Sequence, residues 1–101
     1  MKLLVVTSLK EYQNKVAQLL DLAKITVFSV TETTGVRDEQ ESNLLDNWFS
    51  SGSEKSDSVF LFSFTDAAKA DQALSLIRKY NAGNETDFPI RAFVLPVEKS
   101  T

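Results

Sequence analysis

One segment of the sequence, Ser-Val-Phe-Leu-Phe-Ser-Phe-Thr at positions 58–65, most constrains the fold because it is apolar on both faces of a strand. Successive side chains of a strand point to opposite sides, so Val59 and Leu61 share one face while three phenylalanines share the other. A strand with one solvated face normally alternates apolar and polar residues. The pattern therefore predicts a central strand that needs cover on both of its faces.

Three further segments have the composition of strands. Runs of apolar and β-branched residues predict strands at 2–7, 25–33 and 90–95. Pro96 closes the last of these, because proline cannot donate to a strand ladder. The first and last strands, like 58–65, carry apolar residues on both faces. We therefore expect both faces of the sheet to be apolar.

Two helices are predicted from capping residues and from apolar residues at helical spacing. Ser8 and Glu11 have the spacing of a capping box and predict a helix from about Leu9 to Ala23. Asp66 is the expected N-cap of a second helix, and Gly83 its expected C-terminal cap in the left-handed conformation. The stripes predicted to face the core are Tyr12, Val16, Leu19, Leu20 and Ala23 in the first helix and Ala70, Ala73, Leu74, Ile77 and Tyr80 in the second.

The order of these elements is β-α-β-β-α-β, which predicts an α+β fold of the ferredoxin-like kind. Right-handed crossovers place both helices on one face of a four-stranded antiparallel sheet. We expect a single domain over 1–101, with a long loop between the second and third strands at about 34–57. The uncovered face of the sheet is apolar, so we expect a second copy of the chain to cover it. The alternative is that the long loop or the C-terminal tail folds across this face.

Composition excludes several classes of function. The chain has no cysteine and no histidine, which removes disulfides, the commonest zinc ligands and Ser-His-Asp catalysis. Its net charge is −3, from 11 Lys and Arg against 14 Asp and Glu, which argues against binding to nucleic acid. The apolar run at the N-terminus is too short for a signal peptide or a membrane span. We expect a soluble cytoplasmic protein that neither binds a metal nor acts as an enzyme.

Three segments of the sequence resemble the PII nitrogen-regulatory signalling proteins of the PII/CutA superfamily. The run Val-Thr-Glu-x-x-Gly at 30–35 matches the end of the second strand in that family and stands, as there, before a long loop. The stretch 62–77 looks like the family's third strand and second helix. The ending at 92–99 looks like the one that PII proteins share with CutA trimers. The resemblance covers nearly the whole chain and suggests a divergent PII-like protein.

The resemblance implies a regulatory protein rather than an enzyme. PII proteins are homotrimers whose sheets face inward, and they bind nucleotides in clefts between subunits. Their long loop, the T-loop, engages transporters or enzymes. For this chain the resemblance implies a small anionic ligand, with an adenine nucleotide as one candidate, and a partner such as a membrane transporter. The implied ligand-binding residues are Ser29, Thr31, Gly35, Val36, Arg37, Gly83 and Arg91.

The segment before the last strand departs from the PII pattern. The family has a Gly-Asp-Gly-Lys run that grips phosphate, whereas this chain reads Asn-Glu-Thr-Asp-Phe-Pro-Ile-Arg at 84–91. Arg91 stands in for the lysine, but Glu85 and Asp87 add negative charge and Pro89 lacks a backbone donor. The family's Lys-Pro pair after the first strand, its basic C-terminal segment and its modified loop tyrosine are also absent. These departures argue against ATP binding in the family's standard manner.

The long loop carries large apolar side chains among polar ones. Leu44, Leu45, Trp48 and Phe49 fall on one side of a short predicted helix. Such a cluster favours docking on a partner protein, with packing on this or a neighbouring subunit as the alternative. Because the calcium-loop pattern is missing, we expect a solvated charged face rather than a cation site at Asp38, Glu39, Glu41 and Asp46.

Three other classes fit parts of the sequence. A CutA-like trimer associated with metal tolerance shares the ending, but it would here lack the soft ligands His and Cys. An ACT-like amino-acid-binding module shares the order of elements, yet such modules have a glycine in the first β-α turn, where this chain has Ser8 and Leu9. A ferredoxin-like monooxygenase fits least, since the sequence places no nucleophile beside a base and offers no histidine.

Overall fold

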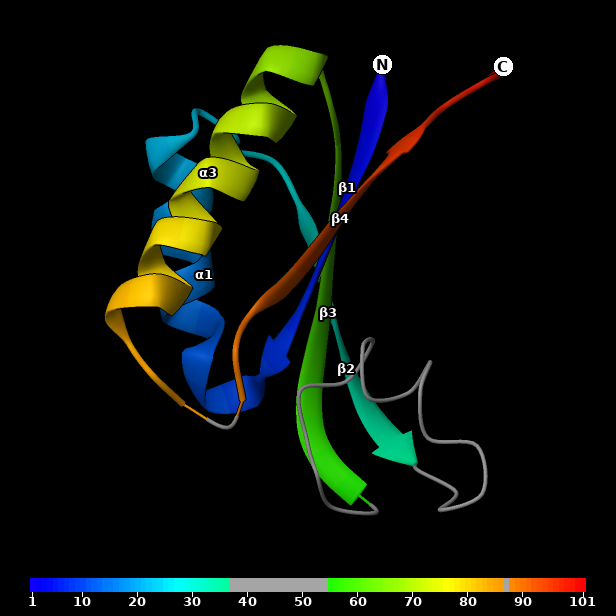
Figure 1. Ribbon diagram of the computed structural model, residues 1–101. Helices are drawn as coiled ribbons and strands as arrows, with labels where there is room; N and C mark the ends of the chain where they lie inside the picture. The colour runs from blue at the N-terminus through cyan, green and yellow to red at the C-terminus, as the bar shows by residue number, and fades with distance from the viewer. Residues whose placement is uncertain (37–54, 87) are drawn as a thin grey trace.

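In the part of the chain that the structure describes, two helices and four strands follow one another in the predicted order. The structure is a computed structural model that describes residues 1–36, 55–86 and 88–101. Its elements are β1 (Lys2–Leu9), a 3-10 turn η1 (Lys10–Tyr12), α1 (Gln13–Leu22), β2 (Ser29–Val36), β3 (Lys55–Thr65), α3 (Ala67–Gly83) and β4 (Arg91–Pro96) (Figure 1). All pairings between the strands are antiparallel, in the order β2-β3-β1-β4.

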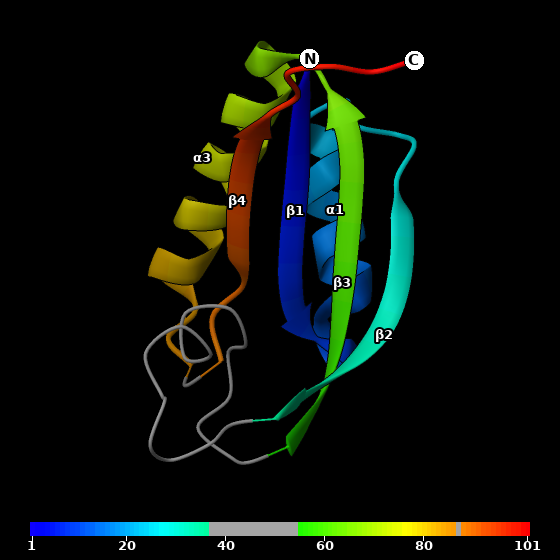
Figure 2. The same ribbon diagram turned by 90° about the vertical axis from the view of Figure 1, so that its right-hand side faces the viewer.

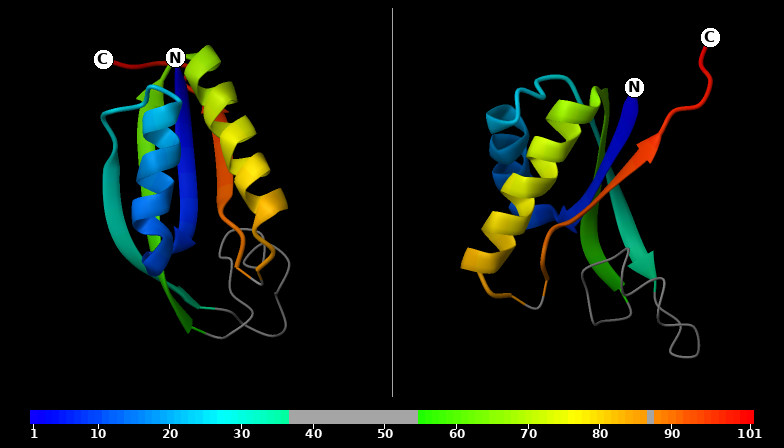
Figure 3. Two further views of the ribbon diagram at one scale, coloured as in Figure 1. Left: turned by 90° about the vertical axis from the view of Figure 1, so that its left-hand side faces the viewer. Right: turned by 45° about the horizontal axis from the view of Figure 1, so that its top comes forward.

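The described elements form two layers, with both described helices on the same side of the sheet. Figure 2 shows the sheet from its other side, with α1 and α3 lying behind it. Turned to the opposite side, α1 and α3 lie next to each other across the strands (Figure 3). The predicted ferredoxin-like α+β fold is therefore confirmed.

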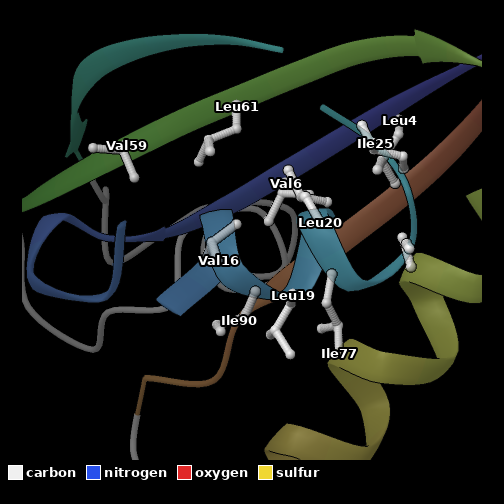
Figure 4. Packing of buried hydrophobic residues seen from close by; sticks show 12 residues of the cluster. Leu4, Val6, Val16, Leu19, Leu20, Ile25, Val59, Leu61, Ile77 and Ile90 are labelled. Atoms are coloured by element: carbon white, nitrogen blue, oxygen red, sulfur yellow. The ribbon is translucent and has the colours of Figure 1, made fainter. Parts of the chain in front are cut away.

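The hydrophobic core lies between the helices and the sheet (Figure 4). Leu4 and Val6 of β1 and Leu61 of β3 project into it and are almost completely buried. Burying a side chain of this size contributes about 1.5–3 kcal/mol to stability. Both predicted helical stripes face this core except for Tyr12, which lies in η1 outside α1 and is not part of the core. The buried members of the stripes are Val16, Leu19, Leu20, Ala23, Ala70, Ala73 and Ile77.

The two helices begin differently. The Asp66 carboxylate accepts a 2.8 Å hydrogen bond from the backbone N–H of Lys69, as expected for the N-cap of α3. The capping box predicted at Ser8 is wrong. β1 runs two residues further than expected, and Ser8 lies buried in it opposite Val59, with its hydroxyl donating to the Leu9 carbonyl at 3.0 Å. Extended pairing with β3 therefore keeps Ser8 in the strand, and a 3-10 turn precedes α1.

The second strand begins at Ser29 rather than at residue 25. Lys24 adopts the left-handed conformation (φ 66°), and the N–H of Ile25 donates to the Leu20 carbonyl at 2.9 Å, so the chain turns back beneath α1 before it extends. The buried Ser63 hydroxyl donates to the Val27 carbonyl at 2.7 Å and attaches this connecting segment to β3. Ile25, directly after this turn, is buried in the core.

The strands at the loop are longer than predicted. β2 continues to Val36 and β3 already begins at Lys55, with these two residues paired. Positions 34–36 and 55–57 of the predicted loop therefore belong to strands. The remainder of the loop, 37–54, lies outside the described residues.

The predicted left-handed cap at Gly83 is wrong. Gly83 is the last residue of α3, and among the described residues no glycine has a positive φ. The next residue, Asn84, ends the helix with φ −135°, and its side-chain amide donates to the Tyr80 carbonyl at 2.9 Å. This amide satisfies one of the terminal carbonyls that the backbone of a glycine cap would otherwise satisfy. A Cβ on Gly83 would have no atom within 4 Å.

Gly83→Ala is therefore expected to stabilise the protein. The backbone is helical and the site is open, so alanine loses less conformational entropy on folding and gains about 0.5 kcal/mol. The free energy of unfolding from urea denaturation measures this gain. Ala82→Gly, at the neighbouring exposed position, is the matched control and should lose a similar amount. A loss of stability in Gly83→Ala would contradict the helical conformation at this residue.

Candidate functional site

The sheet surface opposite the helices, called the open face below, is made largely of apolar side chains. Register places three rows of side chains across β3, β1 and β4 on this side. Within the described residues no helix or strand covers it (Figure 2). The three rows, each written from β3 to β4, are Phe64–Leu3–Leu95, Phe62–Val5–Phe93 and Phe60–Thr7–Arg91.

The open face is most exposed at the row that contains Phe64. Phe64 is 58% exposed and Leu95 45% exposed, whereas Val5 between Phe62 and Phe93 is buried. The phenylalanines of β3 contact one another, with ring centroids 5.7 Å apart for Phe60 and Phe62 and 6.5 Å for Phe62 and Phe64. A continuous aromatic strip of this kind is typical of a surface that packs against another protein.

The predicted ligand-binding residues fall into three places. Ser29 and Thr31 of β2 lie on the open face, paired with Phe62 and Phe60, and Arg91 of β4 lies in the same row as Thr31. Three strand spacings separate Thr31 from Arg91, which is about 14 Å, the span of an extended small molecule.

The remaining ligand-binding residues do not join this row. Gly35 and Val36 lie at the end of β2 where the loop begins, paired with 56 and 55. Gly83 ends α3 in the helical layer, on the other side of the sheet (Figure 1). Arg37 and the predicted partner-binding residues Leu44, Leu45, Trp48 and Phe49 lie outside the described residues. The same holds for the carboxylates considered as a cation site, Asp38, Glu39, Glu41 and Asp46.

An ion pair that the sequence analysis missed lies at the root of the loop. Lys10 Nζ of η1 pairs with Glu32 Oε1 of β2, and both side chains are more than half exposed. The two residues line a hollow of about 240 Å³, together with Thr33, Thr34, Asp57 and Ser58. The pKa of Lys10 is raised, first by its hydrogen bond to Glu32, then by the charge of Glu32, and least by Asp57. No local sequence signal links Lys10 to Glu32. The pairing of β1 and of β2 with β3 brings the end of β1, which Lys10 follows, close to Glu32.

A second hollow lies between the end of α3 and the start of β4. Its volume is about 720 Å³, and the described residues that line it are Asn81, Asn84, Glu85, Thr86, Phe88 and Pro89. Glu85 is the only charged residue among them. A lining with a carboxylate and no cation disfavours a phosphate group, in agreement with the sequence departures at 84–91.

Asn81 is a further residue that the sequence analysis did not single out. Its side-chain amide donates to the Ile90 carbonyl at 2.8 Å, and its amide oxygen accepts from the Ile90 N–H at 3.1 Å. This double hydrogen bond fixes the start of β4, and with it the position of the neighbouring Arg91. A single Asn in the last turn of a helix gives no sequence signal for such a contact.

Comparison with known proteins identifies the fold. No protein-family model and no curated protein matches the sequence. A crystal structure of a candidate PII-like signalling protein from Thermus thermophilus superposes with a TM-score of 0.62 at 12% identity, covering 92% of this chain and 82% of that one. A DUF3240 family protein from Shewanella baltica has a TM-score of 0.66 at 15% identity, covering 99% of this chain and 92% of that one. The chain has a PII-like fold.

Two searches of the described residues bear on other functions. Neither helix is long and apolar enough to span a bilayer. Over 1–36, 55–86 and 88–101, no three Asp, Glu, His or Cys side chains gather as they would around a metal ion.

The Lys10–Glu32 pair predicts a measurable change in titration. Because the pair raises the folded-state pKa of Lys10, it stabilises the fold below the ordinary lysine pKa, and this contribution disappears as the pH rises through the raised value. Glu32→Gln should lower the pKa of Lys10 toward its ordinary value, as followed by NMR of the lysine side chain. Asp57→Asn is the control and should lower the pKa less. Equal effects of the two variants would rule out Glu32 as the main partner.

Proposed function

We propose that this chain is a PII-like regulatory protein that forms a homotrimer, binds a small anionic ligand and docks on a partner protein. The open face is the observation that carries this proposal. Its aromatic strip leaves Phe64 and Leu95 exposed, and the helices already cover the other side of the sheet. The protein from Thermus thermophilus that shares this fold is described as a PII-like signalling protein.

A homotrimer with the open faces turned inward would bury the exposed strip. Phe64 and Leu95 would move out of water, and each side chain of this size contributes about 1.5–3 kcal/mol when fully buried. Three such surfaces meeting at one axis bury each other's apolar side chains, and the assembly closes at three copies. This arrangement supports a closed assembly over an open chain of subunits.

The ligand-binding proposal rests on the row that contains Arg91. Arg91 supplies a guanidinium for an anionic group, Phe60 an aromatic face on which a base can stack, and Thr31 a hydroxyl. A nucleotide has a group to match each of these: a phosphate, a base and a sugar hydroxyl. An adenine nucleotide is the candidate that the PII resemblance favours. Bound here at the rim of the trimer, it would contact more than one subunit.

Docking on a partner would follow from the position of the row next to the loop. Thr31 belongs to β2, which leads directly into the loop at 37–54. A ligand with different affinity for two arrangements of the loop shifts the balance between them. We infer that Leu44, Leu45, Trp48 and Phe49 form the surface that meets the partner, such as a transporter, in the cytoplasm.

The trimer is tested by placing a charge on the open face. Phe64→Asp should convert the protein from three times the 11.3 kDa chain mass to a single chain, as measured by light scattering, because a carboxylate cannot be buried among the phenylalanines without a partner. Leu22→Asp is the control, since Leu22 is 63% exposed on α1 and away from the open face. A wild-type monomer, or a trimer that survives Phe64→Asp, would overturn the arrangement.

Ligand binding is tested by titrating ADP, ATP and cyclic dinucleotides while the fluorescence of Trp48, the only tryptophan, is followed. We expect one nucleotide to give a saturable change, and Arg91→Gln to weaken its binding about tenfold, because a charge-assisted hydrogen bond is lost. Lys79→Gln removes one positive charge elsewhere and should leave the affinity unchanged. If every nucleotide fails on a confirmed trimer, nucleotide sensing is rejected while the assembly stands.

A further inference from the structure

The outer edge of β4 presents backbone groups in an alternating order. Among the described strands β4 is outermost, with β1 as its one neighbour. The Val97 N–H donates to the Met1 carbonyl at 3.3 Å, and hydrogen-bonded pairs alternate from there along the register. The N–H and C=O groups of Arg91, Phe93 and Leu95 therefore point toward β1. Those of the intervening residues, Ala92 and Val94, point away from the sheet.

Both ends of this edge are closed. The outward groups of Ile90 are satisfied by the side-chain amide of Asn81, which pairs with its N–H and C=O as a neighbouring strand would. At the other end Pro96 lacks an N–H. Ala92 and Val94 therefore form a short open ladder, and within the described residues no strand or side chain pairs with their outward groups.

A groove runs beside this ladder, between α3 and β4. Its volume is about 350 Å³, and it is lined by Leu74, Ile77, Arg78, Asn81, Ile90, Arg91, Ala92 and Phe93. The described lining contains two arginines and no acidic residue. Arg91 Nε is buried and, among the described residues, has no hydrogen-bond partner. The two arginines, with no acidic residue beside them in the described lining, make the groove complementary to a carboxylate.

We propose that the α3–β4 groove binds an extended segment of a partner protein that carries an acidic side chain. The segment adds to the sheet beside β4 and pairs with the outward backbone groups of Ala92 and Val94. Its apolar side chains on the helix side lie over Leu74 and Ile77. Its acidic side chain lies on the open-face side of β4, next to Arg91, as a cross-strand pair.

The β2 edge of a second copy of this chain fits the α3–β4 groove less well than such a segment. β2 is the other outermost strand among the described ones, and Glu32 is the only carboxylate in it. Glu32 already pairs with Lys10, so a β2 edge could supply Arg91 with a carboxylate only by breaking that pair. The proposal goes beyond the proposed function, although Arg91 belongs to both the ligand row and the groove, and it is tested in the absence of nucleotide.

The test uses the full chain and a pool of acetylated, amidated nine-residue peptides of alternating β-branched residues with one central Glu. We expect members of the pool to bind and to slow hydrogen exchange at the amides of Ala92 and Val94, as seen by NMR. Replacing the Glu by Gln, or Arg91 by Gln, should each weaken the tightest peptide about tenfold. The two changes together should weaken it no further than one alone, because they remove the same contact.

Lys79→Gln is the matched control, since it removes one positive charge from α3 outside the groove. It should leave the affinity unchanged. Three results would overturn the proposal: no peptide slows exchange at Ala92 and Val94, the Glu and Gln peptides bind equally, or both amides are already protected in the free protein by a neighbouring copy. Because these measurements follow two backbone amides, they are independent of the nucleotide titration.

Discussion

The central strands β1 and β3 are apolar on both faces, and the rest of the structure depends on this property. Two amphipathic helices are enough to cover one face, and Leu4, Val6 and Leu61 disappear beneath them. The same strands must then present their other apolar residues to the opposite side, because successive side chains alternate. The fold therefore creates the open face as a consequence of its own core, and an assembly is the simplest way to complete it.

The two edges of the sheet are treated differently. At the β2 edge a charged side chain, Glu32, is held by Lys10, and charge on an edge discourages unwanted pairing. At the β4 edge Asn81 imitates a strand at Ile90 but leaves Ala92 and Val94 open. The β4 edge is therefore open over two residues only, with Asn81 at one end and Pro96 at the other.

The sequence predicted what depends on local pattern. Helical spacing identified the core faces of both helices, and Asp66 was recognised because a cap acts within its own helix. The capping box predicted at Ser8 was wrong because the same residues also fit the end of a strand, and pairing with β3 decides between the two. The left-handed cap predicted at Gly83 was wrong because the side-chain amide of Asn84 donates to the Tyr80 carbonyl at the end of the helix instead. The Lys10–Glu32 and Asn81–Ile90 contacts depend on tertiary register, which periodicity does not encode.

Arg91 links the two proposed binding surfaces. It lies in the row of the open face that contains Thr31, and it also lines the α3–β4 groove. One guanidinium cannot give the same donors to a nucleotide anion and to a partner's carboxylate. Binding at one surface should therefore weaken binding at the other by the same factor, since coupling between two sites is reciprocal. A single side chain at the corner of the sheet would in this way connect ligand occupancy to partner release without any change of fold.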